Sequence, residues 1–64
     1  MNKIPRNATK LDVTFHDRND AHMIATKDEI GWHGVDDNGT RWFLLVSHLR
    51  NSELCTIKVL ERKI

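Results

Sequence analysis

Residues 30–46 read IGWHGVDDNGTRWFLLV, two arms rich in aromatic and β-branched residues on either side of Asp37-Asn38-Gly39-Thr40. Asn-Gly between such arms is the strongest short-range signal for a β-hairpin, because both central residues of a type I′ turn have positive φ. Asn tolerates that conformation, and Gly has no Cβ to oppose it. The stretch therefore predicts a hairpin with Asn38-Gly39 as its two-residue turn.

This turn also predicts which side chains share a face of the hairpin. It pairs Val35 with Trp42 and Trp32 with Leu45, so the two tryptophans point to opposite faces. One face, the expected core, holds Val35, Trp42, Leu44 and Val46. The other face holds Ile30, Trp32, Gly34, Phe43 and Leu45. The second face is too apolar for open water. Either a bulge at Gly31 or Gly34 turns Trp32 inward, or another molecule covers this face.

The rest of the chain alternates in short segments. In residues 10–16, Leu11, Val13 and Phe15 share one face, as in a half-buried strand. Residues 21–26 and 54–62 predict two further strands, and polar residues at 17–20 and 27–29 predict turns. A short helix over residues 54–64 is the alternative for the last segment, but its β-branched residues favour a strand. Ser47–Asn51 is expected to form one helical turn, with Ser47 as its N-cap and Leu49 tucked beneath the sheet.

These elements predict a mostly β protein, a single small antiparallel meander or an SH3-like barrel of about five strands with one short helical turn. Residues 1–9 are expected to form a flexible N-terminal arm, and residues 10–64 a single small β domain. The order of elements over residues 10–62 resembles the SH3-like small-barrel architecture. That resemblance is one of topology, rests on no sequence motif, and implies a binding module.

Composition limits the class of protein. The chain has 64 residues, a net charge of +1 and one cysteine, Cys55. No disulfide can form within one chain, so we expect a cytoplasmic protein with Cys55 as a small buried hydrophobe. No apolar run approaches the ~20 residues of a membrane span, and the N-terminus lacks the apolar core of a signal peptide.

Basic residues concentrate near the two ends of the chain. They are Lys3, Arg6 and Lys10 at one end and Lys58, Arg62 and Lys63 at the other. If the terminal strands pair, these six could form one basic patch. A solvated rim that keeps the sheet edges from aggregating is the simpler interpretation.

No pattern indicates catalysis, a cofactor or a metal. The histidines are His16, His22, His33 and His48. With Cys55 they supply enough ligands for zinc, but they lack the short paired spacing of zinc sites. Ser47-His48 are neighbours whose side chains diverge in an extended strand, so they form no nucleophile–base pair. The acidic pairs Asp28-Glu29 and Asp36-Asp37 fall in turns and are expected to be turn residues.

We therefore expect a non-catalytic module that binds another protein or a second copy of itself, with no membrane and no small-molecule substrate. A small bacterial or phage-encoded regulator fits this size. The expected anchors are Trp32, Phe43 and Leu45, with Arg41 at the rim, because Trp and Arg are common interface hot spots. The alternative is a nucleic-acid-binding β-barrel that uses aromatics together with Lys27, Lys58 and Arg62.

Overall fold

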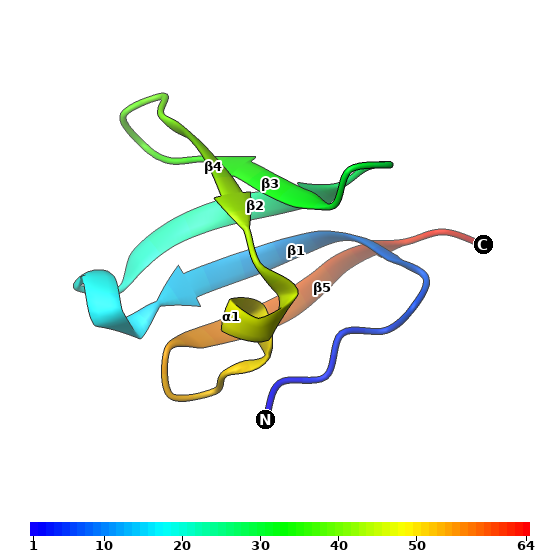
Figure 1. Ribbon diagram of the computed structural model, residues 1–64, viewed down its shortest axis with the longest axis horizontal. Helices are drawn as coiled ribbons and strands as arrows, with labels where there is room; N and C mark the ends of the chain where they lie inside the picture. Colours follow the sequence, from blue (N-terminus) through cyan, green and yellow to red (C-terminus); the bar gives the residue numbers. More distant parts are fainter.

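The computed structural model describes residues 1–64 as one five-stranded antiparallel sheet with a short helix and a 3₁₀ turn (Figure 1). Along the chain the elements are β1 (Ala8–Phe15), the 3₁₀ turn η1 (His16–Arg18), β2 (Ala21–Lys27), β3 (Trp32–Val35), β4 (Arg41–Leu44), α1 (Val46–Arg50) and β5 (Cys55–Arg62).

The sheet is an open meander whose last strand returns to the first. Its strand order is β4-β3-β2-β1-β5, so β4 and β5 form the two edges. The mostly β prediction with about five antiparallel strands and one short helical turn is confirmed. The barrel alternative is not, because β4 and β5 do not pair with each other to close it. The chain between them instead forms α1, which lies across the face of the sheet near β1 and β5 (Figure 1).

The core lies on one face of the sheet. Strand alternation sends Leu11, Val13 and Phe15 of β1 to this face, as predicted, and all three are buried. Their partners in the register are Ala25, Met23 and Ala21 on β2 and Val59, Ile57 and Cys55 on β5. Cys55 is fully buried, which confirms its interpretation as a small core residue.

The hairpin register differs by one residue from the prediction. Val35 pairs with Arg41 and Trp32 with Leu44, so the loop has three residues, 37–39. The Gly39 N–H donates to the Asp36 carbonyl, and Gly39 has a φ of +80°, whereas Asn38 does not have a positive φ. This pattern is that of a type I turn followed by a left-handed glycine. The carboxylate of Asp36 stabilises it by accepting hydrogen bonds from the backbone N–H groups of Asn38 and Thr40, each at 2.9 Å.

A one-residue change in register moves every side chain of a strand to the other face. Trp32, Trp42 and Leu44 therefore share the core face, and the prediction that the tryptophans diverge was wrong. Trp32 is only 3% exposed, whereas Val35, predicted to lie in the core, is 51% exposed.

Gly34 is required by close packing between β3 and β2. It faces the core, opposite Ala25 on β2. A Cβ at Gly34 would lie 2.7 Å from the carbonyl oxygen of Ile24 and 2.8 Å from the Met23 side chain. The absent side chain is what lets Met23 enter the core beside β3. The glycine therefore marks a close approach.

The helix lies one residue earlier than predicted. Leu45, not Ser47, occupies its N-cap position, and no side chain caps it. Its buried residue is Leu49, as predicted, and this side chain is fully enclosed. With five residues, α1 is far too short to cross a membrane, and no helix of the structure is long and apolar enough to do so.

The first residues contact the domain where the sequence predicted a flexible arm. The Asn2 side-chain amide donates to the carbonyls of Leu49 (3.0 Å) and Cys55 (2.8 Å), and its backbone N–H donates to Arg50 (2.8 Å). Strand β1 begins at Ala8, two residues earlier than expected, and Ala8 is buried. The segment therefore lies against α1 and the start of β5.

The burial of Trp32 predicts that Trp32→Ala unfolds the protein. Removing a buried Trp side chain costs about 3–5 kcal/mol, comparable with the entire stability of a domain this small. Phe43→Ala is the matched control, because its ring is 66% exposed, and it should change stability by less than about 1 kcal/mol. Urea titration followed by circular dichroism measures both. Equal midpoints for Trp32→Ala and wild type would contradict the assignment of Trp32 to the core.

Candidate binding site on the β4 edge

The most apolar segment of the chain is also poorly buried. Residues 42–46 are Trp-Phe-Leu-Leu-Val, yet none is buried. Trp42 is 36% exposed, Phe43 66% and Leu45 71%, while Leu44 is half-buried and Val46 exposed. Burial of apolar surface is worth about 25 cal/mol per Å², so leaving such a segment in water gives up stability. Exposed apolar surface of this kind marks interaction sites.

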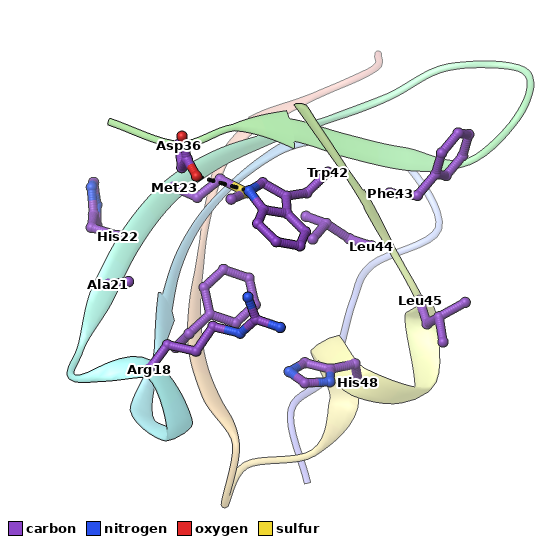
Figure 2. A pocket seen from close by; sticks show the side chains of 11 residues that line it. Arg18, Ala21, His22, Met23, Asp36, Trp42, Phe43, Leu44, Leu45 and His48 are labelled. Atoms are coloured by element: carbon purple, nitrogen blue, oxygen red, sulfur yellow. Dashed lines mark hydrogen bonds between the residues drawn. The ribbon is translucent and has the colours of Figure 1, made fainter. Parts of the chain in front are cut away.

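On the outer side of the sheet, this segment continues an exposed apolar surface. Val35 pairs with Ile24 across β3 and β2, and Phe43 lies on the same face of the sheet, opposite His33 on β3. The Phe43 ring meets the His33 ring edge-on, with 6.5 Å between centroids. Figure 2 shows the Phe43 and Leu45 side chains directed away from the core side of β4. We call Ile24, Val35, Phe43 and Leu45 the outer patch.

On the inner side of β4 lies a pocket of about 230 Å³ (Figure 2). Its apolar wall comes from the core face of three strands, with Phe15, Ala21, Met23, Trp42 and Leu44 among its lining residues. Its charged or polar lining residues are Arg18, His22, Asp36 and His48. The Nε2 atom of His48 is buried without a hydrogen-bond partner, 4.0 Å from the nearest carboxylate oxygen of Asp17.

Trp42 forms one wall of the pocket and is held in place by the hairpin loop. Its indole Nε1–H donates to the Asp36 carboxylate at 2.9 Å, while the other carboxylate oxygen holds the loop backbone. The Trp42 indole, followed by the N–H groups of Thr40 and Asn38, lowers the pKa of Asp36 below its ordinary value of 3.8. Asp36 is therefore ionised at neutral pH, and its charge is compensated by three N–H donors.

Arg18 lies at the other side of Trp42. Its guanidinium carbon is 4.9 Å from the Trp42 ring centroid, a cation–π contact. It is positioned by the tight connection after η1, where Asn19 and Asp20 both have positive φ. No carboxylate lies within ion-pair distance of Arg18. The stacked face orients the guanidinium, and its in-plane N–H groups remain free to donate.

The residues predicted to bind a protein divide between two environments. Phe43, Leu45 and Arg41 are exposed. Trp32 is in the core and is not available as an exposed anchor. Trp42 was assigned to the core face, where it lies, but its partial exposure and its place in the pocket wall were missed. A three-residue hairpin loop, which Asp36-Asp37-Asn38-Gly39 also permits, would have placed both tryptophans on one face.

The basic residues gather on a different part of the molecule. Strand β1 pairs with β5, Ala8 lies opposite Arg62, and the Lys63 N–H donates to the Asn7 carbonyl. Residues 1–14 and 56–64 together hold six lysines and arginines against two acidic residues, a net charge of +4. Residues 15–55 hold four against seven, a net charge of −3. The net charge of +1 is therefore the sum of a basic terminal region and an acidic central region. Lys27 lies apart, at the end of β2.

The histidines are distributed among separate partners. His16 contacts the Thr56 hydroxyl at 2.6 Å, His22 pairs with Asp12, and His33 contacts Asp28 at 2.5 Å. No three His, Cys, Asp or Glu side chains gather as a metal site. The Cys55 thiol donates to the His48 carbonyl at 3.0 Å, and burial raises its pKa, which opposes formation of a reactive thiolate.

The acidic pairs act in turns, as predicted. The Asp28 carboxylate accepts hydrogen bonds from the backbone N–H groups of Ile30 (2.8 Å) and Gly31 (3.2 Å). The Ile30 N–H, followed by the His33 ring, lowers the pKa of Asp28. Asp36 plays the equivalent role in the hairpin loop. Each pair therefore contributes one carboxylate that organises backbone.

The lowered pKa of Asp36 predicts a pH dependence of the pocket wall. A carboxyl with a depressed folded-state pKa stabilises the hairpin above its unfolded value, 3.8, and that contribution is lost as the pH falls through the folded value. We expect the Trp42 indole N–H signal in NMR spectra to be constant down to about pH 4 and to shift below it. Asp36→Asn should abolish this transition and Asp28→Asn should retain it. A transition that persists in Asp36→Asn would contradict the assignment.

Comparisons of this chain with models of protein families, with curated proteins and with solved structures find no match.

Proposed function

We propose that this protein is a non-catalytic module that binds another protein through β4 and the residues that follow it. The observation that carries the proposal is the apolar run at 42–46, five consecutive large side chains of which none is buried. A chain of 64 residues has few such side chains, and those that it leaves in water are the ones that a partner gains most by covering.

The composition of the surface agrees with a protein partner. Phe43 is a large side chain on an edge strand, opposite His33, and Val35 and Ile24 pair with each other farther along the same face of the sheet. Aromatic side chains dominate interface energetics because they bury 150–250 Å² each. Arg41 is exposed next to Val35, which suits the polar rim of an interface. In this proposal Phe43 and Leu45 replace Trp32 as the outer anchors, and the protein acts as a small regulator that occupies a surface of a larger one.

Site-specific photo-cross-linking tests this proposal. A benzoylphenylalanine placed at Phe43 should yield one discrete covalent product with another protein in cells that express the chain naturally. The matched control is the same substitution at Leu60, an exposed apolar residue on β5, at the opposite edge of the sheet. Introducing Leu45→Ser beside the probe should reduce the product about tenfold or more without altering the circular dichroism spectrum. The same products from positions 43 and 60 would refute a specific site at β4.

A second candidate, nucleic-acid binding, is favoured by one observation, the net charge of +4 on residues 1–14 and 56–64. Within this region the only ion pair between a lysine or arginine and an acidic side chain joins Lys10 to Glu61, at 3.2 Å. Lys58 and Arg62 lie on β5 beside the paired terminal residues. No tryptophan or phenylalanine accompanies them, so contacts to phosphates rather than base stacking would supply the affinity.

Fluorescence anisotropy with labelled duplex DNA and single-stranded RNA over a range of KCl concentrations tests this candidate. Phosphate binding should weaken steeply with salt, and Lys58→Ala with Arg62→Ala should reduce the slope of log K against log salt by about 2. Arg50→Ala, an arginine on α1, is the control and should leave the slope unchanged. No anisotropy change at low salt, or an unchanged slope in the double variant, would refute this function.

A further inference from the structure

We infer that the pocket behind β4 receives one large apolar side chain from an extended, acidic segment of the partner protein, which adds as a strand to the free edge of β4. This inference rests on the proposed function and specifies the chemistry of the partner.

The size of the pocket favours a single side chain. Sites for small molecules and cofactors usually enclose about 300–1,000 Å³, whereas this pocket holds about 230 Å³. Its apolar wall, with Phe15, Met23 and Trp42, suits a Phe, Trp or Leu side chain. A second hollow, of about 360 Å³, shares none of these lining residues, and five of its six lining residues are polar, so it does not extend the pocket for a larger ligand.

The free edge of β4 borders this pocket. In an antiparallel pair, the N–H and C=O groups of alternate residues face the partner strand. The Asp36 N–H donates to the Thr40 carbonyl, so Thr40 directs its backbone groups toward β3. Every second residue after it, Trp42 and Leu44, does the same, whereas Arg41 and Phe43 direct their backbone groups to the open side. Phe43 lines the pocket although its ring points away from it (Figure 2), so its main chain forms part of the rim.

An added strand would therefore place its main chain on unpaired groups beside the pocket. Successive side chains of a strand point to opposite faces. One side chain of the segment would enter the pocket, and its two neighbours would point to the outer side, toward Phe43 and Leu45. Recognition by strand addition works in this way, with main-chain hydrogen bonds for affinity and a side-chain pocket for specificity.

The charges at the pocket explain why the segment is acidic. The guanidinium of Arg18 has no carboxylate partner, and its stacking on Trp42 fixes its plane. Asp36, the other charged group that lines the pocket, already accepts hydrogen bonds from three N–H donors. The uncompensated charge at the pocket is thus the positive charge of Arg18. A carboxylate of the partner can accept hydrogen bonds from two N–H groups of this guanidinium at once.

The other edge of the sheet lacks this combination. Strand β5 carries Lys58, Glu61 and Arg62, and charged side chains on an edge strand oppose pairing with another strand. None of the β5 residues lines the pocket. Strand β4 carries one charge, Arg41, and its other three residues are apolar. The charged β5 edge therefore opposes the addition of a strand, whereas the mostly apolar β4 edge permits it.

NMR titration of the ¹⁵N-labelled protein tests the pocket. The probes are 3-phenylpropionate, which joins an apolar ring to a carboxylate, and its neutral amide. The carboxylate should shift the Trp42 indole signal and bind with a Kd in the millimolar range, and the amide should bind about tenfold more weakly. Arg18→Gln should remove this difference. Arg50→Gln is the matched control and should preserve it. No shift of the Trp42 signal at about 10 mM carboxylate would overturn the inference.

A second titration tests strand addition. The probe is a capped seven-residue peptide with a central Phe, a Glu two residues after it on the same face of the strand, and Thr at the other positions. It should protect the Arg41 and Phe43 amides from hydrogen exchange, and methylation of its backbone nitrogens should abolish that protection. Protection of these amides by raising the protein concentration alone would mean that a second copy occupies the edge, which would overturn the choice of partner.

The inference and the proposed function fail separately. Val35→Ser alters the outer patch at a residue that does not line the pocket, so this variant should still bind 3-phenylpropionate as wild type does. A specific cross-link at position 43 without probe binding would retain the protein-binding function and overturn the pocket. Probe binding without any cross-link would retain the pocket as an apolar carboxylate site, but it would overturn both the proposed function and the partner inferred from it.

Discussion

The carboxylate of Asp36 is the constraint on which the β4 side of this protein rests. One oxygen accepts the N–H groups of Asn38 and Thr40, and the other accepts the indole N–H of Trp42. The first set fixes a three-residue loop and thereby the register of β3 with β4. The second fixes the ring that forms the pocket wall. Because Trp42 in turn contacts Arg18, one side chain in a turn organises a pocket to which three separate elements contribute.

The parts of the fold that the sequence predicts are those set by local alternation. Leu11, Val13 and Phe15 alternate strictly, and one face of β1 is buried, so pattern and structure coincide. The hairpin itself was predicted, but its register was not. Asn38-Gly39 favours a two-residue turn, whereas the Asp36 side chain stabilises a three-residue one, and only the second places Trp32 and Trp42 together against the core. A difference of one residue was enough to misplace Trp32 and Val35.

The candidate site was predictable only in part, because its members meet through the tertiary fold. Phe43 and Leu45 could be found from the apolar run in which they occur. Arg18 could not, since it precedes a turn in a polar segment and reaches Trp42 only because β2 returns along β1. The free edge of β4 likewise depends on where β5 pairs. Its pairing with β1 rather than β4 leaves the sheet open, and no local pattern in β4 or β5 determines that choice.

The pairing of β5 with β1 also accounts for the difference between the β4 edge and the β5 edge. A helix of five residues can cover little more than the surface beneath Leu49, so α1 protects the core over β1 and β5 and leaves β4 uncovered. Pairing the two terminal segments in β1 and β5 places opposite charges across from each other, Lys10 from Glu61 and Asp12 from Lys58, which favours this pairing. The charged side chains of β5 also oppose the addition of another strand at that edge. The chain thus protects one edge by charge and leaves the other apolar and open, so β4 is the edge at which a partner strand meets the least opposition.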